Sequence, residues 1–218
     1  MRWAPSRHAL GQYCNTQGLR TFLSSLLYHR AYFTPHLRVP SVAALDYAAL
    51  KARGIEHIVF DKDNTVTVPY ERRYASMKIH DSLIHYCVGV FGHSNVAFLS
   101  NSAGSSDDKD HHEAVDCEHV LGIQFIRHKQ KKPAVREDIL RHFGTSRPDT
   151  ICVVGDRVLS DIVMGNQFGM FTVLVDPIDP SKDNFVVRLV RRFESRLVGR
   201  QSAEHPVVGP AEGLIKRD

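Results

Sequence analysis

Apolar and polar positions between residues 57 and 177 form blocks that predict strands and helices in alternation. Five short runs are rich in β-branched residues and nearly continuous in apolar character, which is typical of strands buried on both faces of a parallel sheet. The five runs are HIVFD (57–61), NVAFLS (95–100), GIQFIRH (122–128), DTICVVGD (149–156) and MFTVLVDP (170–177).

Amphipathic helices are predicted between these runs. Residues 77–91 form one, Pro133 begins a second that stops at Gly144, and residues 158–168 form a third that ends near Gly169. Such alternation predicts an α/β fold, with a mainly parallel five-stranded sheet and helices on both of its faces.

Both ends of the chain differ from this central pattern. Residues 18–30 place leucine and phenylalanine side chains on one helical stripe, and residues 184–200 predict a basic amphipathic helix. We therefore expect four parts: a basic segment that contains the 18–30 helix (1–45), a catalytic domain (46–180), a basic amphipathic helix (181–200) and a polar tail (201–218).

Composition places the chain among soluble globular proteins, with 43% hydrophobic and 24% charged residues and a net charge of +4. No apolar run reaches the roughly 18–20 residues of a membrane span. The four cysteines have neither metal-binding nor secretory spacing, which indicates a reducing compartment. No acidic residue precedes Asp46, whereas arginine and serine recur there. This is typical of an organelle transit peptide, and an incidental basic tail is the alternative.

Polar side chains stand where the predicted strands end. Asp61 ends the first, Ser100 the second and Asp156 the fourth, while Lys131 and Lys132 follow the third. Ligands of open parallel sheets bind beyond the carboxyl ends of the strands, so we expect these side chains to converge on one edge.

Two simpler interpretations of the first strand end fail. A Ca²⁺-binding loop needs glycine where Val66 stands and glutamate where Arg72 stands. A turn in which Asp61 and Asp63 only accept backbone N–H groups would leave the polar residues at the other strand ends unexplained.

In chain order, these residues resemble the four motifs of the haloacid-dehalogenase (HAD)-type phosphohydrolase superfamily. The resemblance implies a HAD-like Rossmannoid fold and phosphoryl transfer through an aspartyl-phosphate intermediate. The matching residues are Asp61, Asp63, Thr65, Ser100, Lys132, Asp156 and Asp161.

The resemblance implies separate roles for the paired aspartates. Asp61 attacks phosphorus, while Asp63 protonates the leaving alkoxide and later takes a proton from water. Carboxylate and phosphate are both negative, so a cation must lie between them, and Mg²⁺ suits their oxygens. Asp61, the Asp63 carbonyl and Asp156 are its expected ligands, and Asp161 supports them or the lysine.

The substrate phosphate is expected to contact the remaining motif residues. Thr65, Ser100 and the amide of Asn101 would hold its oxygens, as an oxyanion hole does. Lys132 would supply a fixed positive charge. Lys131 is the alternative, and Lys132 is preferred because the matching family lysine stands directly before a proline.

Residues 66–99 and 103–131 are too short to add a cap domain to the helix and strand that each must supply. An open site suits a phosphate on a large body, such as a protein, a nucleic acid or a lipid in a bilayer. The basic helix favours the lipid, because its apolar face can enter the acyl boundary while arginines contact anionic headgroups. The alternative is a helix packed on the sheet with its arginines extended to water. The arginines are Arg188, Arg191, Arg192 and Arg196.

A closer resemblance follows from FDKDNTVTVPY, SNSAG, KKP and VVGDRVLSDI, which are similar to the mitochondrial phosphatidylglycerophosphate phosphatases, a capless branch related to bacterial phosphatases. Members remove the terminal phosphate of phosphatidylglycerophosphate for cardiolipin synthesis, on the matrix face of the inner membrane. Ser160 stands where threonine is commoner. A capless phosphatase of phosphoproteins or soluble esters, and a non-catalytic membrane-binding scaffold, are the alternative functions.

Other partners are disfavoured. Nucleic acid is not expected, because the basic residues lie on helices with apolar stripes and no aromatic platform accompanies them. Zinc is not expected at residues 111–119, because the spacing of His111, His112, Cys117 and His119 fits no standard site. The sequence does not indicate an oligomeric state.

Overall fold

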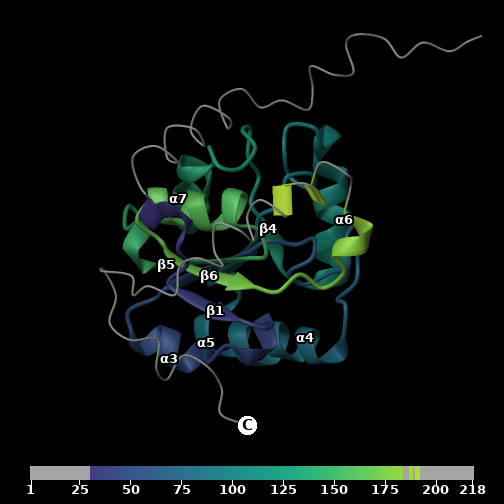
Figure 1. Ribbon diagram of the computed structural model, residues 1–218. Helices are drawn as coiled ribbons and strands as arrows, with labels where there is room; N and C mark the ends of the chain where they lie inside the picture. The colour runs from purple at the N-terminus through teal and green to yellow at the C-terminus, as the bar shows by residue number, and fades with distance from the viewer. Residues whose placement is uncertain (1–29, 184–186, 189, 192–218) are drawn as a thin grey trace, which may run out of the picture. The chain divides into compact units, whose positions relative to one another are not determined.

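The sheet has six strands, all parallel, in the order β1-β6-β5-β2-β3-β4 (Figure 1). The computed structural model describes residues 30–183 together with 187, 188, 190 and 191. The chain divides after Arg30 into two units, and the second contains the sheet. The strands are β1 (Leu37–Val39), β2 (His57–Phe60), β3 (Val96–Phe98), β4 (Gln124–Phe125), β5 (Ile151–Gly155) and β6 (Phe171–Val175).

The α/β class, the parallel sheet and the five predicted strands are confirmed, and one strand is added. β1 pairs with β6 at the sheet edge, so the sheet begins before residue 46. β4 covers two residues of the predicted 122–128 run, because only Gln124 and Phe125 pair with β3. A three-residue strand with no periodic pattern of its own is recognised only through its partner.

Helices cover both faces of the sheet. In Figure 1, α3, α4 and α5 lie below the sheet and α7 lies above it. The α-helices are α3 (Tyr47–Ala52), α4 (Met77–Asp81), α5 (Val88–Phe91), α6 (His112–Leu121), α7 (Arg136–Phe143) and α8 (Val163–Gln167). Short 3₁₀ turns are η1 (Arg30–Phe33), η2 (Val42–Ala44), η4 (His93–Asn95), η5 (Lys109–His111), η6 (Pro148–Thr150) and η8 (Pro180–Lys182).

Alternation along β2 divides the core between the two faces. Ile58 and Phe60 belong to the larger apolar cluster, with side chains from α3, α5, α6 and the helical segment 82–87. Val59 belongs to a second cluster with Ile139 of α7 and Met164 of α8. Both faces of the central strand are therefore buried, as its unbroken apolar sequence predicted.

Two predicted helices contain a wider π-helical turn. Residues 77–91 are helical throughout, but Ser82–Cys87 (η3) forms a π-helix between α4 and α5. Val158–Ile162 (η7) forms a second π-helix, which runs directly into α8. The periods of the two helix types differ too little over one turn for an apolar pattern to separate them. The helix predicted from Pro133 begins at Arg136.

No separate lid occurs in residues 30–183, since the segments between β2 and β4 supply only loops, short turns and the helices α4, α5 and α6. None of the helices in the described ranges is long and apolar enough to cross a bilayer. The predicted helix at 18–30 and most of the one at 181–200 lie outside the described residues. Of its described residues, Val187, Arg188, Val190 and Arg191 are helical, whereas Ser181 and Lys182 belong to the 3₁₀ turn η8.

Candidate active site

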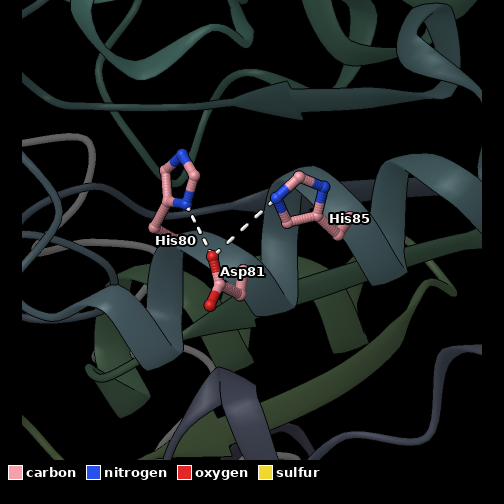
Figure 2. A group of neighbouring side chains, drawn as sticks. All are labelled: His80, Asp81 and His85. Atoms are coloured by element: carbon pink, nitrogen blue, oxygen red, sulfur yellow. Dashed lines mark hydrogen bonds and ion pairs between the residues drawn. The ribbon is translucent and has the colours of Figure 1, made fainter.

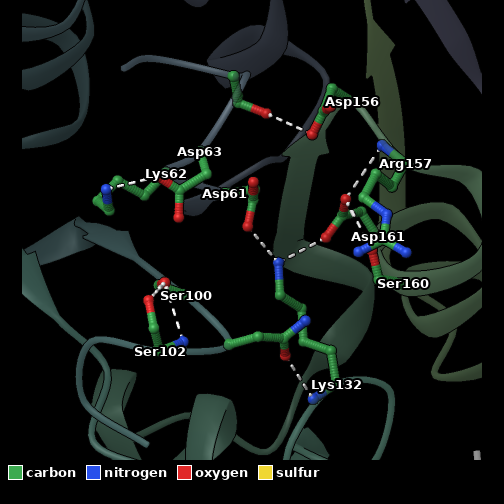
Figure 3. Close-up of polar contacts among 12 residues, drawn as sticks. Asp61, Lys62, Asp63, Ser100, Ser102, Lys132, Asp156, Arg157, Ser160 and Asp161 are labelled. Carbon is green, nitrogen blue, oxygen red and sulfur yellow. Dashed lines mark hydrogen bonds and ion pairs between the residues drawn. The ribbon is translucent and has the colours of Figure 1, made fainter. Parts of the chain in front are cut away.

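Lys132 lies at the centre of the candidate site, between two carboxylates (Figure 3). Its Nζ is 2.5 Å from Asp61 Oδ1 and 2.6 Å from Asp161 Oδ1, and its side chain is only 2% exposed. Lys131, in contrast, pairs with Asp107 at the surface. The geometry therefore selects Lys132 as the lysine that faces the strand ends.

Asp156 follows β5 and is buried beside two donors. Thr65 Oγ1 donates to Asp156 Oδ1 at 3.3 Å, and Arg191 forms a short ion pair with Asp156 Oδ2. Gly155 makes this approach possible, because a Cβ at that position would collide with the Asp161 side chain. The turn from β5 into η7 thus brings Asp156 and Asp161 together.

Two of these contacts differ from the sequence predictions. Thr65 was expected to bind the substrate phosphate, but it is 1% exposed and its hydroxyl is bonded to Asp156. Arg191 was expected to face a membrane, but its side chain is only 14% exposed and pairs with Asp156 and Asp183. Neither contact has a signal in the sequence, because each joins residues far apart in the chain.

Asp63 has different surroundings from Asp61. Its Oδ1 lies 2.6 Å from Lys62 Nζ and accepts the Tyr70 N–H at 3.0 Å. Lys62 is 1% exposed and also donates to the Glu71 carbonyl at 3.0 Å. A buried lysine that closes the loop after β2 thus fixes the Asp63 side chain.

A pocket beside Asp61 is also lined by Ser100, Asn101 and Ser102, which follow β3. The Ser102 N–H donates to Ser100 Oγ at 3.2 Å, and the Lys132 N–H donates to Asn101 Oδ1 at 3.0 Å. His128, 3% exposed, contacts the Ser100 carbonyl through Nε2 at 2.8 Å. These contacts fix the strand end that carries Ser100, and the sequence had not indicated the part of His128.

Burial and charge together shift the pKa values here. Burial raises the pKa of Asp61 to about 8; Lys132 opposes the shift, while Asp161 and Asp156 add to it. Burial likewise raises the pKa of Asp156 to about 6, against the lowering effect of Arg191. Burial alone would lower the pKa of Lys132, but the charges of Asp161 and Asp61 outweigh it and raise that pKa. A cation beside these carboxylates would stabilise their ionised forms.

The three carboxylates fit a divalent cation. One oxygen of each of Asp61, Asp156 and Asp161 lies within 4.8 Å of the others. Both oxygens of Asp161 already accept hydrogen bonds, from Lys132 and from the Arg157 N–H. Both oxygens of Asp156 likewise accept, from Thr65 and Arg191, so Asp61, which accepts from Lys132 through Oδ1, keeps the most lone pairs for a hard cation, and Asp156 is a predicted ligand. The Asp63 carbonyl remains a predicted ligand.

A second group with metal-binding side chains lies on α4 and η3 (Figure 2). His80 Nδ1 is 2.9 Å from Asp81 Oδ1, and His85 Nε2 is 3.9 Å from the same oxygen. These side chains are 34%, 46% and 66% exposed for His80, Asp81 and His85. Ion pairing accounts for their arrangement, and none of them is among the residues around Lys132.

A lysine that holds an aspartate at the end of a central parallel strand is the arrangement that the resemblance to the HAD-type phosphohydrolases had implied. A sequence model described as "Mitochondrial PGP phosphatase" matches residues 17–179, where PGP is phosphatidylglycerophosphate. The chain therefore belongs to the mitochondrial PGP phosphatase family, as the motifs had suggested.

Curated relatives agree with this membership. The chain is 38% identical to phosphatidylglycerophosphate phosphatase 1, chloroplastic/mitochondrial, of Arabidopsis thaliana, over 99% of this chain and 63% of that relative's length. It is 35% identical to the mitochondrial phosphatidylglycerophosphatase GEP4 of Saccharomyces cerevisiae, over 69% of this chain and 81% of that protein. It is 28% identical to the probable phosphatase YqeG of Bacillus subtilis, over 78% of this chain and 91% of that protein. No solved structure matches the chain.

Proposed function

We propose that this phosphatase removes the terminal phosphate of phosphatidylglycerophosphate, giving phosphatidylglycerol, through an aspartyl-phosphate intermediate and with Mg²⁺ as cofactor. The observation that carries the proposal is Lys132 Nζ, 2.5 Å from Asp61 and 2.6 Å from Asp161, in a chain that belongs to the PGP phosphatase family. The substrate is the one that the names of the relatives give.

Asp61 begins the reaction by attacking phosphorus, which forms its bond to the phosphoryl group as the bond to the glycerol oxygen breaks. Asp63 gives its proton to that leaving oxygen. Asp63 then takes a proton from a water molecule that attacks phosphorus, which releases inorganic phosphate and restores Asp61. Lys132 keeps Asp61 aligned and compensates charge on the phosphoryl oxygens, and Ser100 and the Asn101 amide hold those oxygens.

Mg²⁺ would be held by Asp61, Asp156 and the Asp63 carbonyl, and when bound it neutralises charge between carboxylate and phosphate. Asp161 supports Lys132, since its Oδ1 accepts from the lysine. Thr65 and Arg191 orient Asp156 from the other side.

A lipid substrate is supported by the shape of the site. Asp61, Asp63 and Ser100 line a pocket that no lid covers among the described residues. Tyr70, which is 73% exposed, stands at its rim. An exposed aromatic ring with a polar end suits the headgroup region of a bilayer.

We also propose a mitochondrial location, peripheral on the matrix face of the inner membrane, in the synthesis of cardiolipin. The support is the naming of two relatives as mitochondrial and of a third as chloroplastic/mitochondrial, together with the acid-free, arginine-bearing stretch before Asp46. Anionic headgroups would contact Arg188, which is exposed, and Arg192 and Arg196, which lie outside the described residues. Salt-sensitive loss of vesicle binding on neutralising these three arginines tests the contact.

The decisive experiment compares phosphate release from phosphatidylglycerophosphate in mixed micelles with release from water-soluble esters, with and without a chelator. We expect the lipid to be preferred, chelation to abolish turnover and added Mg²⁺ to restore it. Preference for soluble esters by a wide margin would overturn the lipid assignment. Full activity in the presence of chelator would overturn the proposed dependence on Mg²⁺.

A further inference from the structure

The pocket beside Asp61 is large enough for several water molecules. Its volume is about 210 Å³, some seven times the ~30 Å³ that one water molecule takes in the liquid. Arg157, Asp183 and Arg191 line it together with Asp61, Asp63 and Ser100. Cationic side chains therefore border the space beyond the reacting group.

The two arginines differ in the hydrogen bonds and ion pairs that their guanidinium groups form with described residues. Arg191 Nε lies 2.5 Å from Asp183 Oδ2, its Nη1 donates to the Asp156 carbonyl at 3.2 Å, and its Nη2 pairs with the Asp156 carboxylate. Arg157 forms no ion pair with any described residue, and its Nε is buried without a hydrogen-bond partner. Arg157 is thus the pocket cation whose guanidinium is available to a ligand.

The backbone of Arg157 is firmly connected to the reaction centre. Its N–H donates to Asp161 Oδ2 at 3.2 Å, and its carbonyl accepts from the Asp161 N–H at 3.0 Å. Asp161 in turn accepts from Lys132 at 2.6 Å, so it lies between Lys132 and Arg157 in Figure 3. Arg157 is therefore placed to one side of the groups that meet the reacting phosphate.

A buried guanidinium nitrogen without a partner is unfavourable, and native structures leave few such groups. The cost is removed if an anion enters the pocket, because a guanidinium binds phosphate oxygens in a planar fork. The proposed substrate carries a suitable anion: a phosphodiester joined by one glycerol unit to the phosphomonoester that is cleaved.

We propose that Arg157 binds this second, unreacting phosphodiester and thereby selects substrates that carry two phosphates. The inference rests on the proposed function. Lys132, Ser100 and the amide of Asn101 serve the reacting phosphate, while Arg157 serves the next anion along the headgroup. A charge-assisted contact of this kind changes binding by roughly ten- to hundredfold.

The test uses two soluble substrates that differ in the second phosphate. These are sn-glycerol 3-phosphate, and the deacylated headgroup glycerophosphoglycerophosphate, which has no acyl chains and cannot report on surface binding. We expect kcat/KM of the full-length protein to favour the two-phosphate compound at least about tenfold. In Arg157→Gln this ratio should fall towards one, chiefly through KM, and Arg157→Lys should restore part of it.

A binding readout separates this effect from chemistry. With Asp61→Asn as background, calorimetry at fixed Mg²⁺ should show weaker binding of the deacylated headgroup on adding Arg157→Gln, and a smaller change for sn-glycerol 3-phosphate. Arg136→Gln, an exposed arginine on α7 paired with Glu137, is the matched control and should leave the ratio unchanged.

The outcomes are distinguishable from failure of the proposed function. Wild-type protein that hydrolyses phosphatidylglycerophosphate but shows no advantage for the two-phosphate headgroup overturns the subsite alone. If Arg157→Gln lowers kcat/KM equally for both soluble substrates, the subsite is also overturned, since an equal loss indicates a structural role for Arg157. Wild-type protein that does not hydrolyse the lipid overturns the proposed function.

Discussion

Asp61 and Asp63 are two residues apart, yet their side chains meet different partners. Asp61 is held by Lys132 and its carboxylate is 13% exposed, whereas Asp63 is held by Lys62 and is 32% exposed. The buried carboxylate is suited to attack at phosphorus. The more accessible one is suited to exchange a proton with the leaving oxygen and with water.

Asp61→Asn should therefore abolish turnover while leaving the fold intact. A neutral amide cannot attack phosphorus, so phosphate release should fall by at least roughly 10³-fold. Asp107→Asn, which changes an exposed carboxylate paired with Lys131, should retain activity. Phosphate release and circular dichroism measure the two properties, and substantial turnover by Asp61→Asn would reject the covalent mechanism.

Gly155 is a residue whose small size is required by its neighbour. In Gly155→Ala the new Cβ would collide with the Asp161 side chain, which cannot move without losing Lys132. We expect the free energy of unfolding to fall by about 1–3 kcal/mol. Gly89→Ala is the matched control, because its Cβ meets nothing within 4 Å, and we expect it to be neutral or stabilising. Denaturant unfolding measures both, and equal effects would contradict this account.

At the scale of elements, the loop after β2 is joined to the chain that follows β6. The Asn64 carbonyl accepts the Ile178 N–H at 3.0 Å, and its side chain contacts the Asp179 N–H at 2.8 Å and Asp183 Oδ1 at 2.9 Å. Asp183 then binds Arg191. A segment about 130 residues beyond Asp61 in the sequence therefore completes the surroundings of the candidate metal ligands.

Arg191→Gln should weaken binding of a divalent cation. Arg191 lowers the pKa of Asp156, so without it the carboxylate holds its proton more strongly and is less well oriented. Loss of such a supporting contact typically costs about 10- to 100-fold in metal affinity. Mn²⁺ binding followed by electron paramagnetic resonance measures this directly. Arg188 is on the same helical segment but is exposed, so Arg188→Gln should bind Mn²⁺ with the affinity of the wild type. An unchanged Mn²⁺ affinity in Arg191→Gln would contradict the prediction.

At the scale of the whole molecule, six parallel strands bring the ends of β2, β3 and β5 to one edge. The segments that follow β2 and β5 thereby place Asp61, Asp156 and Asp161 close together in a largely buried space. Desolvation and mutual repulsion raise the pKa values of Asp61 and Asp156, and both effects are relieved when a cation binds. Folding stability and cation binding are therefore coupled.

Added Mg²⁺ should raise the Tm of the protein, and the increase should grow from pH 6 to pH 8. Protons compete with the cation below the metal-free pKa values of about 6 for Asp156 and about 8 for Asp61. Ionisation is required for binding, so affinity rises as pH rises through this window. Scanning calorimetry with and without Mg²⁺ measures the shift, which Asp61→Asn should reduce. A shift that does not depend on pH would contradict the coupling.

Several features could be read from sequence because they depend on local pattern. β-branched apolar runs specified the central strands, and the polar residue after each run marked the edge where Asp61, Ser100 and Asp156 meet. The order of motifs also led to the family that the comparisons then showed. The short strand β1 had no such pattern, because only pairing with β6 defines it.

The sequence by itself determined the elements of the central sheet and the chemical groups at their ends, because strand and helix periodicity and turn chemistry act over a few neighbouring residues. Only the tertiary structure decided that Lys132 contacts Asp61, that Thr65 and Arg191 bind Asp156, and that Arg157 forms no ion pair with a described residue. These contacts join residues that are 35 positions apart for Arg191 and Asp156, 71 for Lys132 and Asp61, and 91 for Thr65 and Asp156. Close packing of distant segments, which no local pattern records, determines which charges meet.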